Sequence, residues 1–412
     1  MATLLRLLAV LAVIAAADAF LRRPRRLRNT KPQFWMSSVE LARWLGYTLD
    51  THTFVTSDGY ELVLHHVVAS KNGTRGGLPV VFGHGLASSD EQWYFRPDGL
   101  VPMMVEHGYD LWTFNYRGSF YSRKHETLTT RDHDFWDFSW HENGVVDHAE
   151  SIDYVLNKTG HEKVIAIGHS LSVTALEVLL ATRPEYNDKI MGQVLLSPQV
   201  LTKHATGFVA YVSHMLKLIP GGELGFSANV ENDLFPGFDK PFPQACFPYD
   251  VPKPKIRPFC RRLIEFIMGN FHEPVDEENL QLIMHHFPAG TSIRQMQHYA
   301  QCINSGRFAQ YDYGKDRNQD LYGQDLPPEY NLTNIRTPTY IVYAVGDGSV
   351  NWKDSEAFAK ALQPGVLQKL HRLPPKVFCH IDFVIAYDAV ELVYKPVISY
   401  VDEIKEKWAK QD

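Results

Sequence analysis

The sequence predicts an α/β fold in which a mostly parallel sheet is covered by helices on both faces. Short apolar, β-branched runs alternate with helix-forming stretches, and parallel strands need crossover connections of this kind. The apolar run 164–167 is also followed, through Gly168 and His169, by Ser170 and a helix-forming segment. That order is typical of a strand, a sharp turn and a helix with the serine exposed above the sheet.

The strands and helices are expected in the following order. Asp58-Gly59 predicts a hairpin turn. Strands are expected at 53–56, 61–66, 79–82, 110–115, 164–167, 192–197, 339–344 and 367–373, and helices at about 142–156, after Ser170, after Asp354 and from about 389. Between 201 and 325 an apolar helix-like stretch at 208–219 and many prolines from Pro236 to Pro258 predict an inserted, mainly helical cap.

The amino terminus has the features of a signal peptide over residues 1–19. Arg6 precedes an apolar run at 7–17, and Ala17-Asp18-Ala19 offers a cleavage site. The run is shorter than the roughly 20 residues that span a bilayer, and no other stretch is long and apolar enough. We therefore expect the secretory pathway, with an extracellular or lysosomal destination. The expected organisation is a signal peptide at 1–19, a basic segment at 20–34, a core at 35–200 and 326–412, and the cap at 201–325.

Composition excludes some classes of function and indicates how the cysteines pair. The chain has 412 residues and a formal net charge of −6, which argues against nucleic-acid binding because phosphate contacts need concentrated basic surface. Cys246 and Cys260 are close in sequence and form the favoured disulfide, whereas Cys302 and Cys379 form either a second bridge or two buried thiols. Three sequons offer glycosylation sites at Asn72, Asn157 and Asn331. The sequence has no metal-binding cysteine or histidine pattern and no nucleotide-binding glycine motif, so no metal and no cofactor is expected.

The candidate catalytic residues follow from the position of Ser170. A serine nucleophile needs a base oriented by a carboxylate, and in α/β-hydrolases the chain order is serine, acid, histidine. Asp347 directly follows the expected strand 339–344, and His380 lies between the last strand and the last helix. Each has a plainer alternative as a loop residue; Asp354 and His371 are the second choices.

Backbone donors for a developing oxyanion are expected at two places. One is the amide of Leu171, which follows the nucleophile, and the other is the amide of Leu86 in the loop after strand 79–82. The aromatic cluster at 135–140 is expected to pack in the core, with a role in an acyl pocket as the weaker alternative.

Many segments, in one order, resemble the acid lipase family, the gastric and lysosomal acid lipases of animals. They are Leu45-Gly46-Tyr47, Val55-Thr56-Ser57-Asp58-Gly59-Tyr60, His84-Gly85-Leu86 with Trp93, Asn115-Tyr116-Arg117-Gly118, Phe135-Trp136-Asp137-Phe138-Ser139, Pro288-Ala289-Gly290-Thr291-Ser292, Ser305-Gly306-Arg307-Phe308-Ala309-Gln310-Tyr311-Asp312-Tyr313-Gly314, Gly346-Asp347 and His380-Ile381-Asp382-Phe383. The chain departs from the family at the elbow, which is the turn at residues 168–172 that carries Ser170. The family usually has G-H-S-Q-G there, whereas this chain has Leu171 and Ser172 at the last two positions. The chain also departs at Tyr116, where a serine is usual.

The resemblance implies an α/β-hydrolase fold with a cap over the site and no cofactor. It also implies hydrolysis of neutral lipid esters, triacylglycerols or sterol esters, with Ser170, Asp347 and His380 on the triad positions. The implied partners are a lipid ester substrate and, through the cap, a lipid interface that is contacted transiently. Two alternatives stay open: a secreted lipid-binding homologue with weak or no catalysis, and a soluble short-chain carboxylesterase.

Overall fold

The computed structural model describes residues 32–69, 77–217, 246–247 and 255–410. The predicted signal peptide, almost all of the basic segment and Asn72 lie outside these residues.

A single sheet of nine strands organises the described part of the chain, in the order β1-β2-β4-β3-β6-β7-β8-β9, with β5 paired to β2. The pairs β1–β2, β2–β4 and β2–β5 are antiparallel, and every pair from β4–β3 to β8–β9 is parallel. The predicted α/β fold with a mostly parallel sheet is therefore confirmed. The strands are β1 (Thr48–Val55), β2 (Tyr60–Ala69), β3 (Pro79–Gly83), β4 (Asp110–Asn115), β5 (Lys124–His125), β6 (Val164–His169), β7 (Ile190–Leu196), β8 (Thr339–Tyr343) and β9 (Leu367–Arg372).

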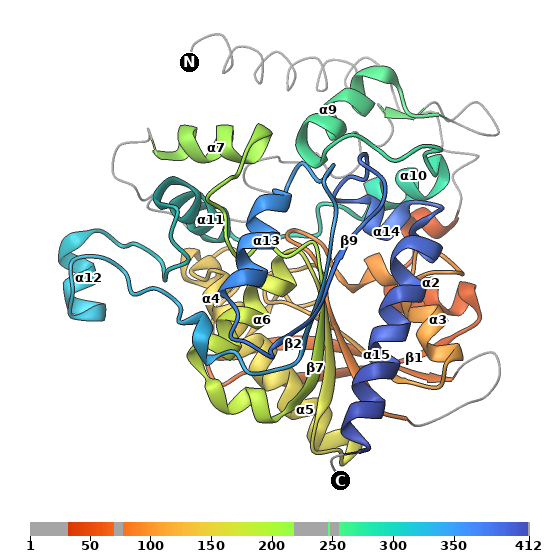
Figure 1. Ribbon diagram of the computed structural model, residues 1–412, viewed down its shortest axis with the longest axis horizontal. Coiled ribbons are helices and arrows are strands. Elements are labelled where there is room, and N and C mark those ends of the chain that lie inside the picture. Colours follow the sequence, from red (N-terminus) through yellow and green to blue (C-terminus); the bar gives the residue numbers. More distant parts are fainter. Residues whose placement is uncertain (1–31, 70–76, 218–245, 248–254, 411–412) are drawn as a thin grey trace.

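Helices cover both faces of this sheet, as Figure 1 shows. Successive residues of a strand point to opposite faces, so Val80 and Phe82 of β3 join one core and Val81 joins the other. The first core includes residues of α2 (Ser38–Leu45), α3 (Leu100–Glu106) and α15 (Lys395–Trp408). The second includes residues of α5 (Ala149–Thr159), α6 (Leu171–Thr182) and α13 (Trp352–Ala361).

Short helical elements complete the core and refine two expectations. They are η1 (Pro32–Trp35), η2 (Asp90–Trp93), η3 (His133–Trp136), α4 (Trp140–Glu142), the π-helical η4 (Asn143–His148), η5 (Pro184–Asp188), η7 (Leu332–Asn334), α14 (Asp382–Ile385) and the π-helical η8 (Val390–Tyr394). The helix expected at about 142–156 consists of α4, η4 and α5. The helix expected after Asp354 begins two residues earlier, because the Asn351 side chain accepts the backbone N–H of Lys353 and caps α13.

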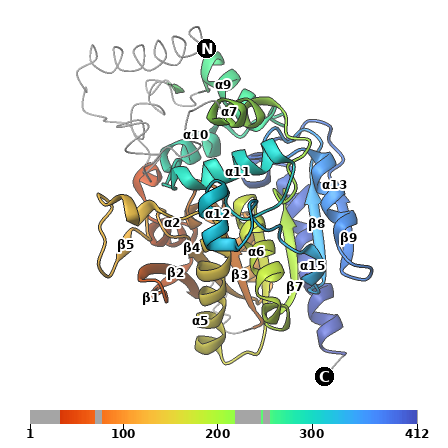
Figure 2. The ribbon, with the colours of Figure 1, turned by 90° about the vertical axis from the view of Figure 1, so that its left-hand side faces the viewer.

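The described part of the segment between β7 and β8 consists of helices joined by loops, with one isolated β-bridge between Ala309 and Glu329. It contains α7 (Gly207–Lys217), α9 (Pro258–Met268), α10 (Glu277–His286), α11 (Ile293–Ser305) and α12 (Lys315–Tyr322). Figures 1 and 2 both place α7, α9, α10 and α11 at one end of the molecule, opposite the C-terminus. Among the residues with described structure, no helix is long and apolar enough to cross a membrane.

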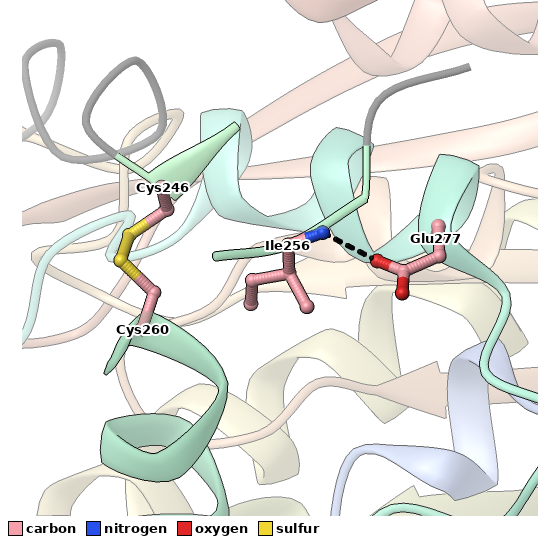
Figure 3. The surroundings of a disulfide bond; sticks show 4 residues. All are labelled: Cys246, Ile256, Cys260 and Glu277. Carbon is pink, nitrogen blue, oxygen red and sulfur yellow. Dashed lines mark hydrogen bonds between the residues drawn. A yellow bond between two sulfur atoms is a disulfide. The ribbon is translucent and has the colours of Figure 1, made fainter. Parts of the chain in front are cut away.

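One disulfide, between Cys246 and Cys260, fastens the start of α9 to the chain before it (Figure 3). This is the bridge favoured from the sequence. Close by, the backbone N–H of Ile256 donates to a carboxylate oxygen of Glu277 at 2.9 Å, which ties the same segment to α10. Cys302 and Cys379 are free and buried, so of the two alternatives for this pair the structure has the two thiols.

Candidate active site

Ser170 occupies the sharp turn between β6 and α6. Its backbone has φ 59° and ψ −116°, a conformation that is strained for a residue with a side chain and that is kept mainly at functional positions. The backbone N–H of Ser170 donates to the carbonyl of Leu196 at the end of β7, at 3.0 Å, which fixes the turn to the sheet. The strand, turn and helix predicted around Ser170 are all present.

Ser172, which stands where a glycine is usual, fits because its neighbours lack side chains. A Cβ atom added to Gly83 would lie 2.0 Å from Ser172 Oγ, and one added to Gly168 would lie 2.9 Å from it. The serine hydroxyl therefore fills space that two glycines leave open, and β3, β6 and α6 keep their close approach.

Tyr116, the second departure, lies buried beneath the elbow. Its ring packs edge-on against His84, with ring centroids 4.9 Å apart, and its hydroxyl lies 3.2 Å from Nδ1 of His148. Burial raises the pKa of the Tyr116 phenol well above its usual value, and the hydroxyl of Ser172 acts in the opposite direction. The two departures from the family pattern are therefore neighbours.

Asp347 and His380 meet at the same edge of the sheet. Nδ1 of His380 lies 2.9 Å from Oδ2 of Asp347, and both side chains are buried. Oδ1 of Asp347 accepts the backbone N–H groups of Ser349 and Val350, each at 2.8 Å, so the loop after β8 holds the carboxylate in one orientation.

The electrostatics of the pair favour an ionised carboxylate. Burial acts to raise the pKa of Asp347. The His380 imidazole and the hydrogen bonds from His380, Ser197 and the Val350 backbone outweigh burial and hold the pKa below its usual value. An ionised Asp347 places the proton of the imidazole on Nδ1, which leaves Nε2 available as a base.

His380 lies close to the elbow, because its ring is beside that of His169, the residue before Ser170. The ring centroids of His169 and His380 are 4.8 Å apart. Burial, and to a lesser extent the positive charge of His380, lowers the pKa of His169 to about 3, so this ring stays neutral.

Ser197 is a site residue that the sequence analysis missed. It directly follows β7, and its Oγ lies 2.6 Å from Oδ2 of Asp347 and 3.0 Å from Nδ1 of His380. Its φ of 50° is a second strained backbone conformation at this edge. The available signal was its position at a strand end, the same signal that selected Asp347.

The C-terminus of α9 holds the loops of Asp347 and His380 together. The carbonyl oxygen of Met268 accepts the backbone N–H of Gly348 and that of His380, each at 3.0 Å. The next residue, Gly269, leaves no room for a side chain, since its Cβ would lie 2.3 Å from the carbonyl oxygen of Gly346. A helix of the inserted segment is therefore part of the site's framework.

The loop that carries Leu86 lies against the elbow. A Cβ added to Gly85 would be 3.7 Å from Cβ of Ser170. His84 fixes the loop because its Nδ1 lies 2.9 Å from the carbonyl of Gly85 while its Nε2 accepts the backbone N–H of Tyr116. Burial lowers the pKa of His84 to about 4, which keeps the ring neutral and able to do both.

Of the two residues predicted to supply oxyanion donors, Leu171 directly follows Ser170, and Leu86 follows Gly85 in the loop beside this turn. Leu171 is the first residue of α6, where the N–H groups of a helix lack intrahelical acceptors. Within the described ranges, neither N–H group donates to a protein acceptor.

The second-choice residues are engaged elsewhere. Asp354 accepts from the backbone and ring of His204, and Nδ1 of His371 lies 3.0 Å from the hydroxyl of Tyr400. The aromatic residues Phe135, Trp136 and Phe138 are buried in a small core of their own, as expected. No group of three or more histidine, cysteine or acidic side chains in the described residues is placed to hold a metal ion.

Two of the three sequons can be located. Asn157 is exposed on α5, and Asn331 is exposed at the start of η7, where its side-chain oxygen accepts the backbone N–H and the hydroxyl of Thr333.

Comparison with known proteins agrees with this fold. The sequence model of the alpha/beta hydrolase fold family matches residues 79–377, and that of a partial alpha/beta-hydrolase lipase region matches 38–96. A solved structure of a soluble variant of monoglyceride lipase from Saccharomyces cerevisiae has the same fold, with a TM-score of 0.50 at 14% identity; the match covers 93% of this chain and 98% of that one.

Sequence relatives define the family within that class. Lipase 1 of Drosophila melanogaster is 31% identical over 383 residues, which cover 92% of this chain and 82% of the relative. Gastric triacylglycerol lipase of Bos taurus is 28% identical over 383 residues, 91% of this chain and 93% of the relative. The chain belongs to the acid lipase family of α/β hydrolases and is a carboxylic ester hydrolase of the lipase type.

Proposed function

We propose that this protein hydrolyses neutral lipid esters, triacylglycerols or sterol esters, through an acyl-enzyme on Ser170. The observation that carries the proposal is the buried contact of 2.9 Å between His380 Nδ1 and Asp347 Oδ2, at the sheet edge where Ser170 sits on a strained turn. The triacylglycerol lipase among the relatives supports this substrate class.

The steps follow from the arrangement of these groups. Ser170 Oγ attacks the ester carbonyl carbon while Nε2 of His380 takes the hydroxyl proton, and Asp347 stabilises the imidazolium that forms. The amides of Leu86 and Leu171 donate to the oxygen that becomes negative; one such donor contributes about 2.7–4 kcal/mol of barrier lowering. His380 then protonates the leaving alcohol. Water, activated by the same histidine, releases the fatty acid and restores Ser170.

The same proposal includes a role for the helices between β7 and β8 as a cap that contacts a lipid interface. Their position at one end of the molecule and the docking of α9 on the loops of Asp347 and His380 support it (Figure 2). We also propose passage through the secretory pathway with glycosylation at Asn157 and Asn331, which the exposure of both side chains supports. A mobility shift on treatment with an endoglycosidase, lost in Asn157→Gln and Asn331→Gln variants, tests the glycosylation.

The nucleophile is tested by Ser170→Ala with Ser355→Ala as the matched control, because Ser355 is a buried serine on α13 whose hydroxyl has no hydrogen-bond partner among the described residues. We expect Ser170→Ala to lower kcat on a long-chain p-nitrophenyl ester by at least about a thousandfold and Ser355→Ala to leave it unchanged. A fluorophosphonate probe should label the wild type and Ser355→Ala but not Ser170→Ala.

Other outcomes lead to the alternatives. A folded wild type that stays unlabelled and inactive contradicts the enzyme proposal and favours a lipid-binding homologue. Faster turnover of short-chain monomers than of emulsified esters favours a soluble carboxylesterase.

A further inference from the structure

The Ser197 hydroxyl contacts both members of the acid–base pair, and the geometry determines where its proton lies. Its oxygen is 2.6 Å from Oδ2 of Asp347, the distance of a strong hydrogen bond to a carboxylate, and 3.0 Å from Nδ1 of His380. A hydroxyl has one hydrogen, which goes to the ionised carboxylate. The lone pairs of Oγ then face Nδ1–H, so His380 shares that hydrogen between Asp347 Oδ2 and Ser197 Oγ.

The backbone at position 197 does not by itself require a serine. Ser197 has φ 50°, a conformation that glycine adopts without strain and serine does not. Its backbone N–H donates to the carbonyl of Val342 on β8 at 2.9 Å, a bond that any residue except proline can make. The backbone role therefore does not require serine, whereas the two contacts of the hydroxyl do.

We propose that Ser197 is a positioning residue for ester hydrolysis, whose hydroxyl holds the Asp347 carboxylate and the His380 imidazole in one plane and one tautomer. This inference rests on the proposed function, because it names a further residue for the same site. Ser197 touches neither the ester nor the attacking oxygen; it acts through Asp347 and His380. In the part of the chain that the structure describes, the titratable side chain that lies against the pair is His169, whose ring is beside that of His380.

Two substitutions separate the hydroxyl from the shape of the backbone. Ser197→Ala removes the hydroxyl and keeps the strained φ, whereas Ser197→Gly removes the hydroxyl and relieves the strain. We expect both to lower kcat by roughly ten- to a hundredfold, the effect of losing a hydrogen bond to a charged group. KM should change by less than about twofold, since the bond strengthens the site only as charge develops.

The pH profile gives a readout that a packing role would not change. The hydrogen bond that Ser197 donates helps to hold the pKa of Asp347 below its usual value, so its loss makes the carboxylate easier to protonate. In both variants the acidic limb of the kcat/KM profile should therefore move to higher pH, while Ser355→Ala, which removes a buried hydroxyl from α13, should follow the wild type. If Ser197→Gly has wild-type kcat and an unchanged acidic limb, the hydroxyl has no positioning role and the inference is overturned.

A measurement without turnover separates this inference from the proposed function. The low-field proton resonance of His380 Nδ1–H, identified by its absence in His380→Asn, should shift in Ser197→Ala and Ser197→Gly and stay in place in Ser355→Ala. If the wild type does not hydrolyse esters but the resonance still shifts in the Ser197 variants, the positioning geometry is supported and the proposed function fails. An unshifted resonance in both Ser197 variants overturns the inference whatever the activity.

Discussion

The carbonyl oxygen of Met268, the last residue of α9, accepts the backbone N–H of His380 at 3.0 Å. The same oxygen accepts the backbone N–H of Gly348, the residue after Asp347. A helix from the segment inserted between β7 and β8 therefore sets the distance between the loop of the acid and the loop of the base. The orientation of this helix and the geometry of the site are mechanically coupled.

Gly269→Ala tests this coupling. Its Cβ would lie 2.3 Å from the carbonyl oxygen of Gly346 and 2.7 Å from the nitrogen of Gly348, so the Asp347 loop must move. We expect kcat/KM for ester hydrolysis to fall at least about tenfold, equivalent to about 1.4 kcal/mol. The matched control is Gly365→Ala, because Gly365 has a similar φ of 87° but nothing within 4 Å of an added Cβ. Equal losses in the two variants would show that backbone strain, not displacement of the loop, is responsible.

Ser172 is predicted to tolerate glycine but not a larger residue. Ser172→Gly restores the usual family residue and should leave kcat/KM within about threefold of wild type, because no bond to the reacting groups is removed. Ser172→Thr adds a methyl group where Gly83 and Gly168 already approach closely, and should lower the free energy of unfolding by about 1–3 kcal/mol. Urea denaturation and esterase assays on both variants check this, and a fully stable Ser172→Thr would contradict the tight packing of the elbow.

Because the carboxyl of Glu177 is buried, we expect the free energy of unfolding to fall as pH rises. Glu177 lies buried on α6, and burial raises the pKa of its carboxyl to about 8. In the unfolded chain the pKa is about 4.3, so between about pH 4.3 and pH 8 the unfolded state releases a proton that the folded state keeps. The stabilisation is therefore complete below the unfolded pKa and is lost progressively up to the folded pKa, by at most about 5 kcal/mol.

Glu177→Gln should flatten this dependence. Urea denaturation at pH 5, 6.5 and 8 should show a smaller decline in the variant than in the wild type, with the largest gain at pH 8. Glu162→Gln, which changes an exposed glutamate, should follow the wild type at all three values. Parallel curves for wild type and Glu177→Gln would mean that Glu177 is ionised in the folded state at neutral pH.

We expect substitution of Arg117 to lower the free energy of unfolding strongly. Its buried guanidinium lies 2.7 Å from the fully buried carboxylate of Asp147 and 2.6 Å from that of Asp58. Arg117→Met leaves Asp147 buried without a counter-charge and should lower the free energy of unfolding by about 3–5 kcal/mol. Lys124→Met breaks the exposed ion pair with Glu61 and should change it by no more than about 1 kcal/mol. A small effect at Arg117, comparable with that at Lys124, would argue against the buried pair.

The sequence predicted the parts of the fold and site that depend on local patterns. Ser170, Asp347 and His380 were selected because each follows a strand, and the carboxyl ends of parallel strands share one edge of a sheet. Ser197 also follows a strand, but its role depends on partners 150 and 183 residues away, which no local pattern reveals. The contact of Met268 with His380 could not be predicted for the same reason.

Two further features depend on packing in three dimensions and could not be predicted from the local sequence. Ser172 departs from the usual elbow, yet the space it fills belongs to Gly83 on a different strand. Glu177 sits on a helix that is buried on every side, and a single acidic residue in an apolar helix gives no sign of whether it reaches solvent.

The parallel pairing of β7 with β8 has a consequence for biosynthesis. Residues 197–338 separate the two strands. During translation the apolar edge of β7 therefore stays unpaired with β8 until most of the polypeptide has left the ribosome. An uncovered hydrophobic edge of this kind invites association with other nascent chains. Asp347 and His380 are also synthesised after that edge, so an incomplete chain would carry Ser170 without the proposed acid and base.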